Sequence, residues 1–259
     1  MGWDIVADDV IDLVVPTLIK NGVRRLMVFD PLNDLRSTAR TIRLANEFGI
    51  YIVGLLVYTI SPVHTDQYYA AKAKEMLGLG VDAIEIKDPS GLLTPDRIRT
   101  LAPAMREAIG EGRDLHIHTH CTTGLGPLVY LEALALGVNV FHTAISPLAH
   151  GASQPPTELI VREARNQGFE AGLDDQKLAE MADYFRDLAD EHNKPLGQPA
   201  GYDPDFYRHQ VPGGMISNLG SQLGEIGMAG RLPEILEEIV RVREELGFPI
   251  MVSPLSQFV

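Results

Sequence analysis

The chain has 259 residues, of which 45% are hydrophobic and 22% charged, a composition typical of soluble globular proteins. Its formal net charge of -13 argues against nucleic-acid and anionic-membrane partners. The apolar runs have the length of strands rather than of membrane spans, and no basic segment followed by an apolar stretch opens the chain. Its single cysteine, Cys121, cannot form an internal disulfide, which fits a reducing compartment. We therefore expect an acidic, cytoplasmic α/β protein without membrane insertion.

The first part of the chain alternates short apolar runs with helix-like segments. Such runs are typical of parallel strands that are buried on both faces. In the helical segments, Thr94 followed by Pro95 is typical of an N-cap and a first helical turn. Residues 77–84 resemble residues 134–141, and each segment has the form of a helix end, a glycine turn and a strand start. The predicted strands are Arg25–Phe29, Tyr51–Tyr58, Ala83–Ile86, Leu115–His118 and Asn139–Ala144.

This alternation fits either a TIM-type (β/α)8 barrel or a doubly wound sheet. The polar residues Asp30, Lys87, His118 and His120 all fall at or just after predicted strand ends, where barrel enzymes keep their chemistry. We therefore expect a TIM-type barrel. Only about five β/α units are visible, whereas a closed barrel of this type has eight. Either the first strands come from another segment or chain, or the barrel is not closed.

After about residue 155 the pattern becomes mainly helical. A long irregular loop at Gln198–Gly214 contains Tyr207 and His209, and loops of this length are often functional. We expect a partial β/α barrel over residues 1–155 and a helical extension over residues 156–259, packed on the barrel mouth. The predicted helices are Pro156–Gln167, Asp174–His192 and Leu232–Leu246.

The clearest chemical pattern is the run of alternating histidines at His116, His118 and His120. Alternate residues of a strand point to the same face, so these three imidazoles share one face. Two neutral imidazoles at this spacing can bind one metal ion. A polar strand end with solvated histidines is the alternative, and the presence of three histidines favours the metal. Because His116 would point deeper into the barrel, we expect His118 and His120 to be the ligands.

Lys87 ends an apolar strand and precedes a turn. Such a lysine is usually a cation whose stem packs on apolar surface. A deprotonated lysine amine can also take up carbon dioxide, and the carbamate that forms is an anionic oxygen ligand for a metal. Residue spacing alone does not choose between these two roles.

Five motifs in this chain resemble the carboxyltransferase family that uses carboxybiotin. This family includes pyruvate carboxylase, the 5S subunit of transcarboxylase and the oxaloacetate decarboxylase alpha subunit. The motifs occur in the family order and span nearly the whole chain, which makes the set specific although each one alone is weak. They are KDPSGLLTP at Lys87–Pro95, HTHCTTG at His118–Gly124, FDPLND at Phe29–Asp34, SQP at Ser153–Pro155 and YRHQVPGGM at Tyr207–Met215.

The resemblance implies a TIM barrel with a helical C-terminal extension and a divalent metal, Zn, Mn or Co. It implies that a carbamylated Lys87, together with His118 and His120, holds this metal beside a small 2-oxo acid, where it stabilises an enolate. Carboxybiotin on a carrier protein or domain would carry the carboxyl group, and a biotin carboxylase would load it. A homo-oligomer is also implied. The further site residues that follow from the motifs are Ser153 and Gln154 as catalytic groups and Tyr207 and His209 as cofactor contacts.

The chain departs from the family pattern in three places. The opening family strand, with an aspartate metal ligand, is absent, and the chain is expected to be truncated at both ends. The family threonine that is proposed to shuttle a proton between biotin and substrate is replaced by Ala152. A methyl group cannot transfer a proton. His150 would share the face of Ala152 if this segment were extended, and it is the candidate replacement.

Two other functions stay open. A metal-dependent aldolase or lyase of a related barrel would share the histidine pair without needing a lysine carbamate. A non-catalytic or degenerate homologue, acting as a binding or assembly subunit, would explain Ala152 and the absent strands. Metal content discriminates the last of these, because a degenerate site would stay empty when metal is added.

Overall fold

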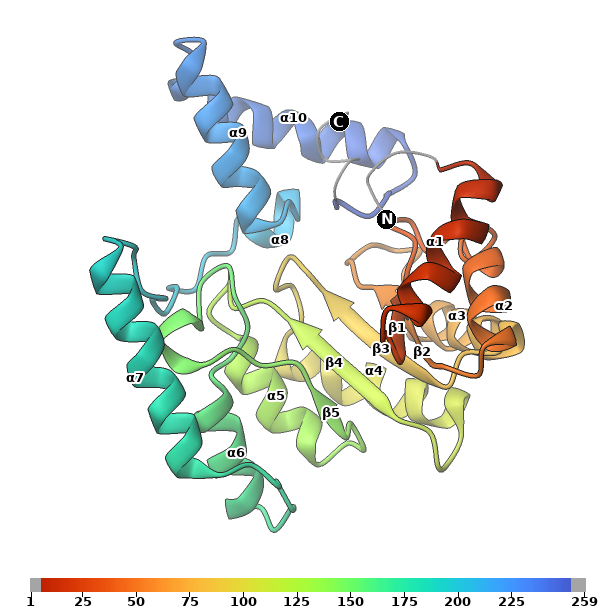
Figure 1. The fold of residues 1–259 in the computed structure, drawn as a ribbon. Helices are drawn as coiled ribbons and strands as arrows, with labels where there is room; N and C mark the ends of the chain where they lie inside the picture. Colours follow the sequence, from red (N-terminus) through yellow and green to blue (C-terminus); the bar gives the residue numbers. More distant parts are fainter. Residues whose placement is uncertain (1–5, 253–259) are drawn as a thin grey trace.

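A computed structural model describes residues 6–252, and these form a five-stranded parallel sheet with ten α-helices (Figure 1). Each strand pairs with the next strand of the chain, so the order in the sheet is the order in the sequence. Consecutive parallel strands joined by helices are the repeating unit of a β/α barrel. The strands are β1 (Arg25–Val28), β2 (Tyr51–Val57), β3 (Ala83–Asp88), β4 (Leu115–Thr119) and β5 (Val140–Phe141).

The helices of the β/α units cover one face of the sheet. Thr65 and Thr94 cap α3 and α4, since each side-chain oxygen accepts a hydrogen bond from the backbone three residues later. The main hydrophobic core lies between these helices and the sheet and includes Ile84, Ile86 and Ile117. The helices are α1 (Asp8–Lys20), α2 (Ala39–Glu47), α3 (Asp66–Leu79), α4 (Pro95–Ile109) and α5 (Gly126–Leu134).

The opposite face of the sheet carries polar side chains on its later strands. In the register of β3 with β4, Glu85 lies opposite His116 and Lys87 opposite His118. Because side chains alternate along a strand, these four residues share the face that is turned away from the main core. A catalytic or metal-binding site can therefore form on this face of the sheet.

The remaining helices lie beside and above the sheet. α6 (Thr157–Asn166) packs against α5, and α7 (Asp175–Glu191) follows it. In Figure 1, α8 (Phe206–His209), α9 (Gly213–Glu225) and α10 (Leu232–Glu245) lie on the side toward which β3 and β4 point. Two short 3-10 turns, Ser146–Leu148 and Ala229–Arg231, complete the described elements.

Two side chains tie α8–α10 to the strand ends. The Gln210 side chain accepts a hydrogen bond from the Thr59 hydroxyl and donates one to the Ile60 carbonyl, and Arg243 donates to the same two residues. A small core of Val211, Ile239 and Met251 forms beneath these helices. The helical C-terminal part therefore contacts the loops at the carboxyl ends of the strands. The division at residue 155 stays a prediction, since α6 packs beside α5 as a further helix of the array.

The predicted strands and the three long C-terminal helices are all present, with shifted ends. β3 and β4 each continue past the predicted stop, so Lys87 and His118 lie inside their strands. β5 is shorter than Asn139–Ala144, because the chain leaves the sheet after His142 N–H donates to the Ile117 carbonyl. The loop expected at Gln198–Gly214 contains α8, and α9 was not predicted. Among residues 6–252, no helix is long and apolar enough to cross a bilayer.

Candidate metal centre

The structure brings the three predicted metal ligands together at the ends of β3 and β4. Lys87 and His118 are register partners on adjacent strands. His120 directly follows β4, and its ring centroid lies 5.1 Å from that of His118. Each of the three residues is partly buried. An amine and two imidazoles therefore converge at one place on the polar face of the sheet.

The tight turn after β3 fixes these side chains. The buried Asp88 carboxylate accepts hydrogen bonds from the backbone N–H groups of Leu92 and Leu93 and from the Thr119 hydroxyl. These bonds hold the turn after β3 against the end of β4. Gly91 has φ +69°, and a Cβ atom placed on it would lie 2.7 Å from the His120 carbonyl oxygen. Only glycine fits this conformation and this close approach without strain.

The segment with the S-Q-P motif lies against the two histidines. His120 Nδ1 lies 2.5 Å from the Ala152 carbonyl oxygen, and Gln154 Nε2 lies 3.3 Å from His118 Nε2. The Ser153 carbonyl accepts a hydrogen bond from Cys121 N–H at 2.8 Å. A carbonyl only accepts, so the His120 proton is on Nδ1 and its Nε2 keeps a lone pair for a metal. Ser153 and Gln154 are thus placed beside the predicted ligands.

The extended geometry that would put His150 on the face of Ala152 is not found. His150 has φ +72°, and its carbonyl accepts a hydrogen bond from Ser153 N–H, so residues 150–153 form a tight turn. The backbone alternation that would put His150 and Ala152 on one face does not apply to a turn. His150 nevertheless supplies the only titratable side chain of residues 149–154.

Burial sets the protonation of the site. It lowers the pKa of His118 to about 2 and also lowers the pKa of His120, so both imidazoles are neutral at physiological pH. Burial lowers the pKa of Lys87 as well, although the Glu85 carboxylate opposes this shift. Metal ligation needs neutral imidazoles, and carbamate formation needs a deprotonated amine. The residues present therefore fit a divalent metal held by a carbamylated lysine and two histidines.

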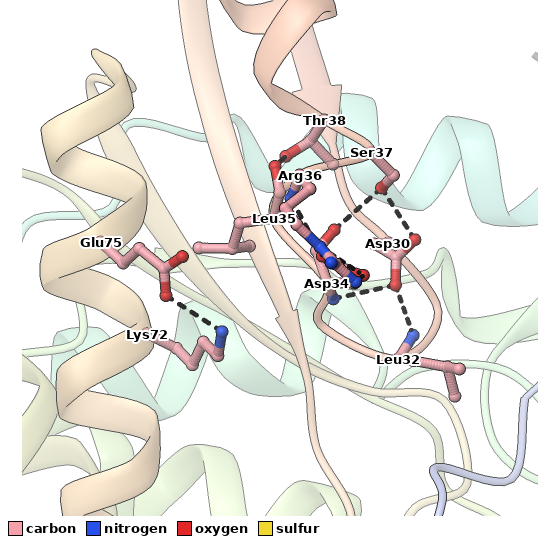
Figure 2. A network of polar contacts seen from close by, with 9 residues as sticks. All are labelled: Asp30, Leu32, Asp34, Leu35, Arg36, Ser37, Thr38, Lys72 and Glu75. Carbon is pink, nitrogen blue, oxygen red and sulfur yellow. Dashed lines mark hydrogen bonds and ion pairs between the residues drawn. The ribbon is translucent and has the colours of Figure 1, made fainter.

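Asp30 does not join this site. Figure 2 shows its carboxylate turned into its own loop, where it accepts hydrogen bonds from Leu32 N–H, Asp34 N–H and the Ser37 hydroxyl. The same loop is anchored by Asn33, whose side chain bonds both the N–H and the carbonyl of Val57 at the end of β2. The F-D-P-L-N-D motif thus shapes the loop after β1.

Tyr207 and His209 lie in α8. Tyr207 lines a cavity of about 420 Å³ between α8 and the loops after β2 and β3, together with Tyr58, His64 and Arg97. His209 is buried, and its Nδ1 accepts a hydrogen bond from Val211 N–H. Another cavity, of about 460 Å³, lies beside β5 and α6 and contains none of the predicted site residues.

Two residues near the site were not predicted. Glu85, two residues before Lys87, is fully buried, and burial raises its pKa to about 7. His142 directly follows β5, with Nδ1 3.6 Å from Glu85 Oε2 and 3.4 Å from His118 Nδ1. The signal that could have found them is strand alternation, which puts Glu85 on the face of Lys87 and His142 on that of Val140.

Known proteins are similar to this chain in sequence and in fold. Over its whole length the chain is 40% identical to a pyruvate carboxylase subunit of Methanocaldococcus jannaschii, of which it covers 46%. It is 33% identical to the methylmalonyl-CoA carboxyltransferase 5S subunit of Propionibacterium freudenreichii, of which it covers 51%. Residues 206–259 match the family described as conserved carboxylase domain. The chain is therefore similar to pyruvate carboxylase-type carboxyltransferases.

Solved structures are similar to this chain in fold. The carboxyl transferase domain of Rhizobium etli pyruvate carboxylase with pyruvate and biocytin superimposes with a TM-score of 0.89 at 27% identity, covering 99% of this chain and 44% of that chain. The five-stranded parallel sheet and its helices therefore match part of the TIM-barrel domain of a carboxyltransferase. The chain spans about half the length of the curated relatives it matches.

Proposed function

We propose that this chain is a carboxyltransferase component that moves a carboxyl group between carboxybiotin and a small 2-oxo acid of the pyruvate or oxaloacetate type. The observation that carries the proposal is the convergence of Lys87, His118 and His120 under the turn 150–154. Support comes from the related R. etli domain, whose structure contains pyruvate and biocytin. Carboxyl transfer to a 2-oxo acid needs a polarised carbonyl close to a proton carrier. The three side chains would polarise the carbonyl through a metal, and the turn would carry the proton carrier.

Lys87 as its carbamate, with His118 and His120, would hold a divalent cation of the Zn, Mn or Co class. When bound, the cation polarises the carbonyl of the 2-oxo acid and stabilises the negative charge of the enolate. The hydrogen bond from His120 Nδ1 to the Ala152 carbonyl fixes the imidazole and leaves the Nε2 lone pair as the atom that would bind the cation. The buried position of Lys87 favours its neutral amine, the form that reacts with carbon dioxide.

In the carboxylation direction a proton leaves the methyl group of the 2-oxo acid. The biotin ureido nitrogen takes up a proton as its bond to the carboxyl carbon breaks, and the enolate carbon forms the new bond to that carboxyl carbon. His150 is the proposed proton carrier, as the titratable side chain of the turn that bears Ala152. Ser153 and Gln154 are proposed to contact the reacting groups, because the Gln154 amide lies beside His118.

The biotin is proposed to arrive on a carrier protein or domain that a biotin carboxylase has loaded, and the chain is proposed to act in a homo-oligomer. Tyr207 and His209 are proposed biotin-side contacts. Tyr207 supports this assignment, since it lines the cavity beside the loops after β2 and β3. Residues 1–155 would supply the barrel part and residues 156–259 the extension that meets the carrier.

The test is the decarboxylation of oxaloacetate in the presence of free biotin, which accepts the carboxyl group in place of the carrier. Metal-loaded protein in bicarbonate should release pyruvate faster with biotin than without it. A panel of 2-oxo acids, including 2-oxoglutarate, would define the acceptor. If no 2-oxo acid reacts although one metal per chain is bound, the proposal fails.

A non-catalytic subunit is the second candidate, and Ala152 is the observation that favours it. Under that proposal the strand ends need not retain a metal. Metal analysis of the purified chain separates the two, since an empty site after incubation with Zn²⁺, Mn²⁺ and Co²⁺ supports the non-catalytic function. About one ion per chain at Lys87, His118 and His120 contradicts it.

A further inference from the structure

A second group of metal-ligating side chains lies deeper in the sheet than the predicted site. Glu85 on β3, His116 on β4 and His142 after β5 each offer a ligand atom, and these atoms lie within 4.8 Å of one another. Glu85 and His116 are register partners, two residues before Lys87 and His118 on the same strands. A two-residue step along a strand is about 7 Å, so Glu85 and His116 form a deeper layer than Lys87 and His118. His142 lies beside both layers, with its Nδ1 3.4 Å from His118 Nδ1.

The side chains of the group are close enough to approach one small cation. His142 Nδ1 lies 3.6 Å from Glu85 Oε2, and the other ring nitrogen, Nε2, lies 3.3 Å from His116 Nδ1, so a cation bound through one of these nitrogens has only one of the two spacings. Ligands that each lie about 2.1 Å from a tetrahedral ion are roughly 3.4 Å apart. One ligand atom from each residue lies within 4.8 Å of the others, so coordination brings these side chains closer together.

The group also contains buried polar atoms that no hydrogen bond satisfies. Glu85 is 0% exposed, and neither carboxylate oxygen has a hydrogen-bond partner among the described residues. Lys87 Nζ is 4.0 Å from Oε1, which is beyond hydrogen-bond range. Nε2 of His116 is likewise buried and unpaired within residues 6–252. A buried carboxylate without a hydrogen bond is costly and rare, and coordination of a cation would remove that cost.

We propose that Glu85, His116 and His142 bind a second divalent cation, of the zinc or cobalt class, separate from the ion expected at Lys87, His118 and His120. A carboxylate with two imidazoles is a common ligand set for these metals, with water in the remaining position. The His142 side chain is 24% exposed, so solvent and metal reach the site from its side of the sheet. The bound cation balances the buried Glu85 charge and ties β3, β4 and β5 together.

The test separates the two sites by counting metal, and it does not depend on carboxyl transfer. The double variant Lys87→Met/His120→Ala removes two ligands of the predicted site and leaves the inner group intact. After chelation and reloading with Zn²⁺, this protein should retain about one Zn per chain. Addition of Glu85→Gln or His142→Asn should remove that ion. The matched control His64→Asn changes a partly buried histidine outside both groups and should leave the count unchanged.

A second measurement distinguishes the loss of metal binding from the loss of folding. Glu85→Met fills the site with an apolar side chain, so the metal-free variant should fold and melt at or above the metal-free wild type. The wild type should gain thermal stability when Zn²⁺ is added, and it should show visible absorption bands when Co²⁺ is added. The triple variant Glu85→Met/Lys87→Met/His120→Ala should show neither response. The proposal is overturned if Lys87→Met/His120→Ala binds no metal, or if its metal survives the loss of Glu85.

Discussion

His120 donates a hydrogen bond from Nδ1 to the carbonyl oxygen of Ala152, at 2.5 Å. This contact joins the end of β4 to the turn at residues 150–154, which are far apart in the sequence. It orients the imidazole through a backbone atom, so the orientation does not depend on which side chain stands at position 152. The side chain at that position is therefore free to vary without loss of the metal ligand geometry.

Ala152→Thr should increase carboxyl transfer. Threonine adds a hydroxyl at the position where the family resemblance implies a proton shuttle, and proton transfer by a well-placed group typically contributes roughly 10²-fold or more in rate. The measurement is kcat for biotin-stimulated oxaloacetate decarboxylation. Ala152→Val is the matched control, since valine has the shape of threonine without the hydroxyl. Equal rates for the two variants would argue that position 152 has no part in proton transfer.

Gly91→Ala should weaken metal binding as well as stability. The added methyl group would collide with the His120 carbonyl and would hold alanine at φ +69°, a strain of about 1–3 kcal/mol. Because His120 must then shift, we expect a weaker apparent Zn²⁺ affinity by competition with a chelator. Gly78→Ala in α3 is the control, since nothing lies near its Cβ position and helix propensity favours alanine by up to about 1 kcal/mol. Unchanged metal affinity in Gly91→Ala would contradict the described packing.

Asn33→Ala should lower the free energy of unfolding by about 2–4 kcal/mol, because it leaves both the N–H and the carbonyl of Val57 without partners in a buried place. Urea denaturation measures this change. Leu32→Ala alters the neighbouring, 48% exposed side chain and should cost less than about 0.5 kcal/mol. Similar costs for the two variants would mean that the Asn33 bonds do not hold the loop after β1.

His64 should make stability fall in acid. Burial, with a smaller contribution from Arg243, lowers the pKa of His64 to about 4, so the folded protein keeps it neutral. Below pH 6.5 the unfolded chain binds a proton that the folded chain does not, and stability is therefore lost as the pH falls toward 4. Relative to His64→Gln, the wild type should lose roughly 2 kcal/mol between about pH 7 and about pH 4.5. A difference that stays constant over this range would contradict the buried neutral imidazole.

The sequence was sufficient for the parts of the fold with strong local patterns. β2 was predicted because its residues are apolar on both faces, β3 and β4 because each contains a short apolar run, and α7 because its apolar residues recur at helical spacing. α9 was missed because it begins with Gly213 and Gly214, residues of low helix propensity, and its packing against α10 decides its conformation. Local pattern thus sufficed wherever it agreed with the tertiary packing.

Part of the candidate site could likewise be predicted from local pattern, and part could not. His118 and His120 lie on one strand end, so their proximity follows from alternation alone. Glu85 and His142 come from strands on either side of β4, and their approach depends on register, which no local pattern fixes. The segment at His150 forms a turn, and not the extended backbone that would align His150 with Ala152; the hydrogen bond from Ser153 N–H to the His150 carbonyl closes this turn.

In the proposed function, a metal held by Lys87, His118 and His120 serves carboxyl transfer. The release of pyruvate from oxaloacetate is the most direct test of this role. The release is measured on metal-loaded protein, with and without free biotin, in the wild type and in Lys87→Ala. The wild type should be stimulated by biotin, and Lys87→Ala should lose the stimulation together with the metal of this site. Biotin-stimulated release that persists in Lys87→Ala, or its absence from metal-loaded wild type, would contradict this role of the metal.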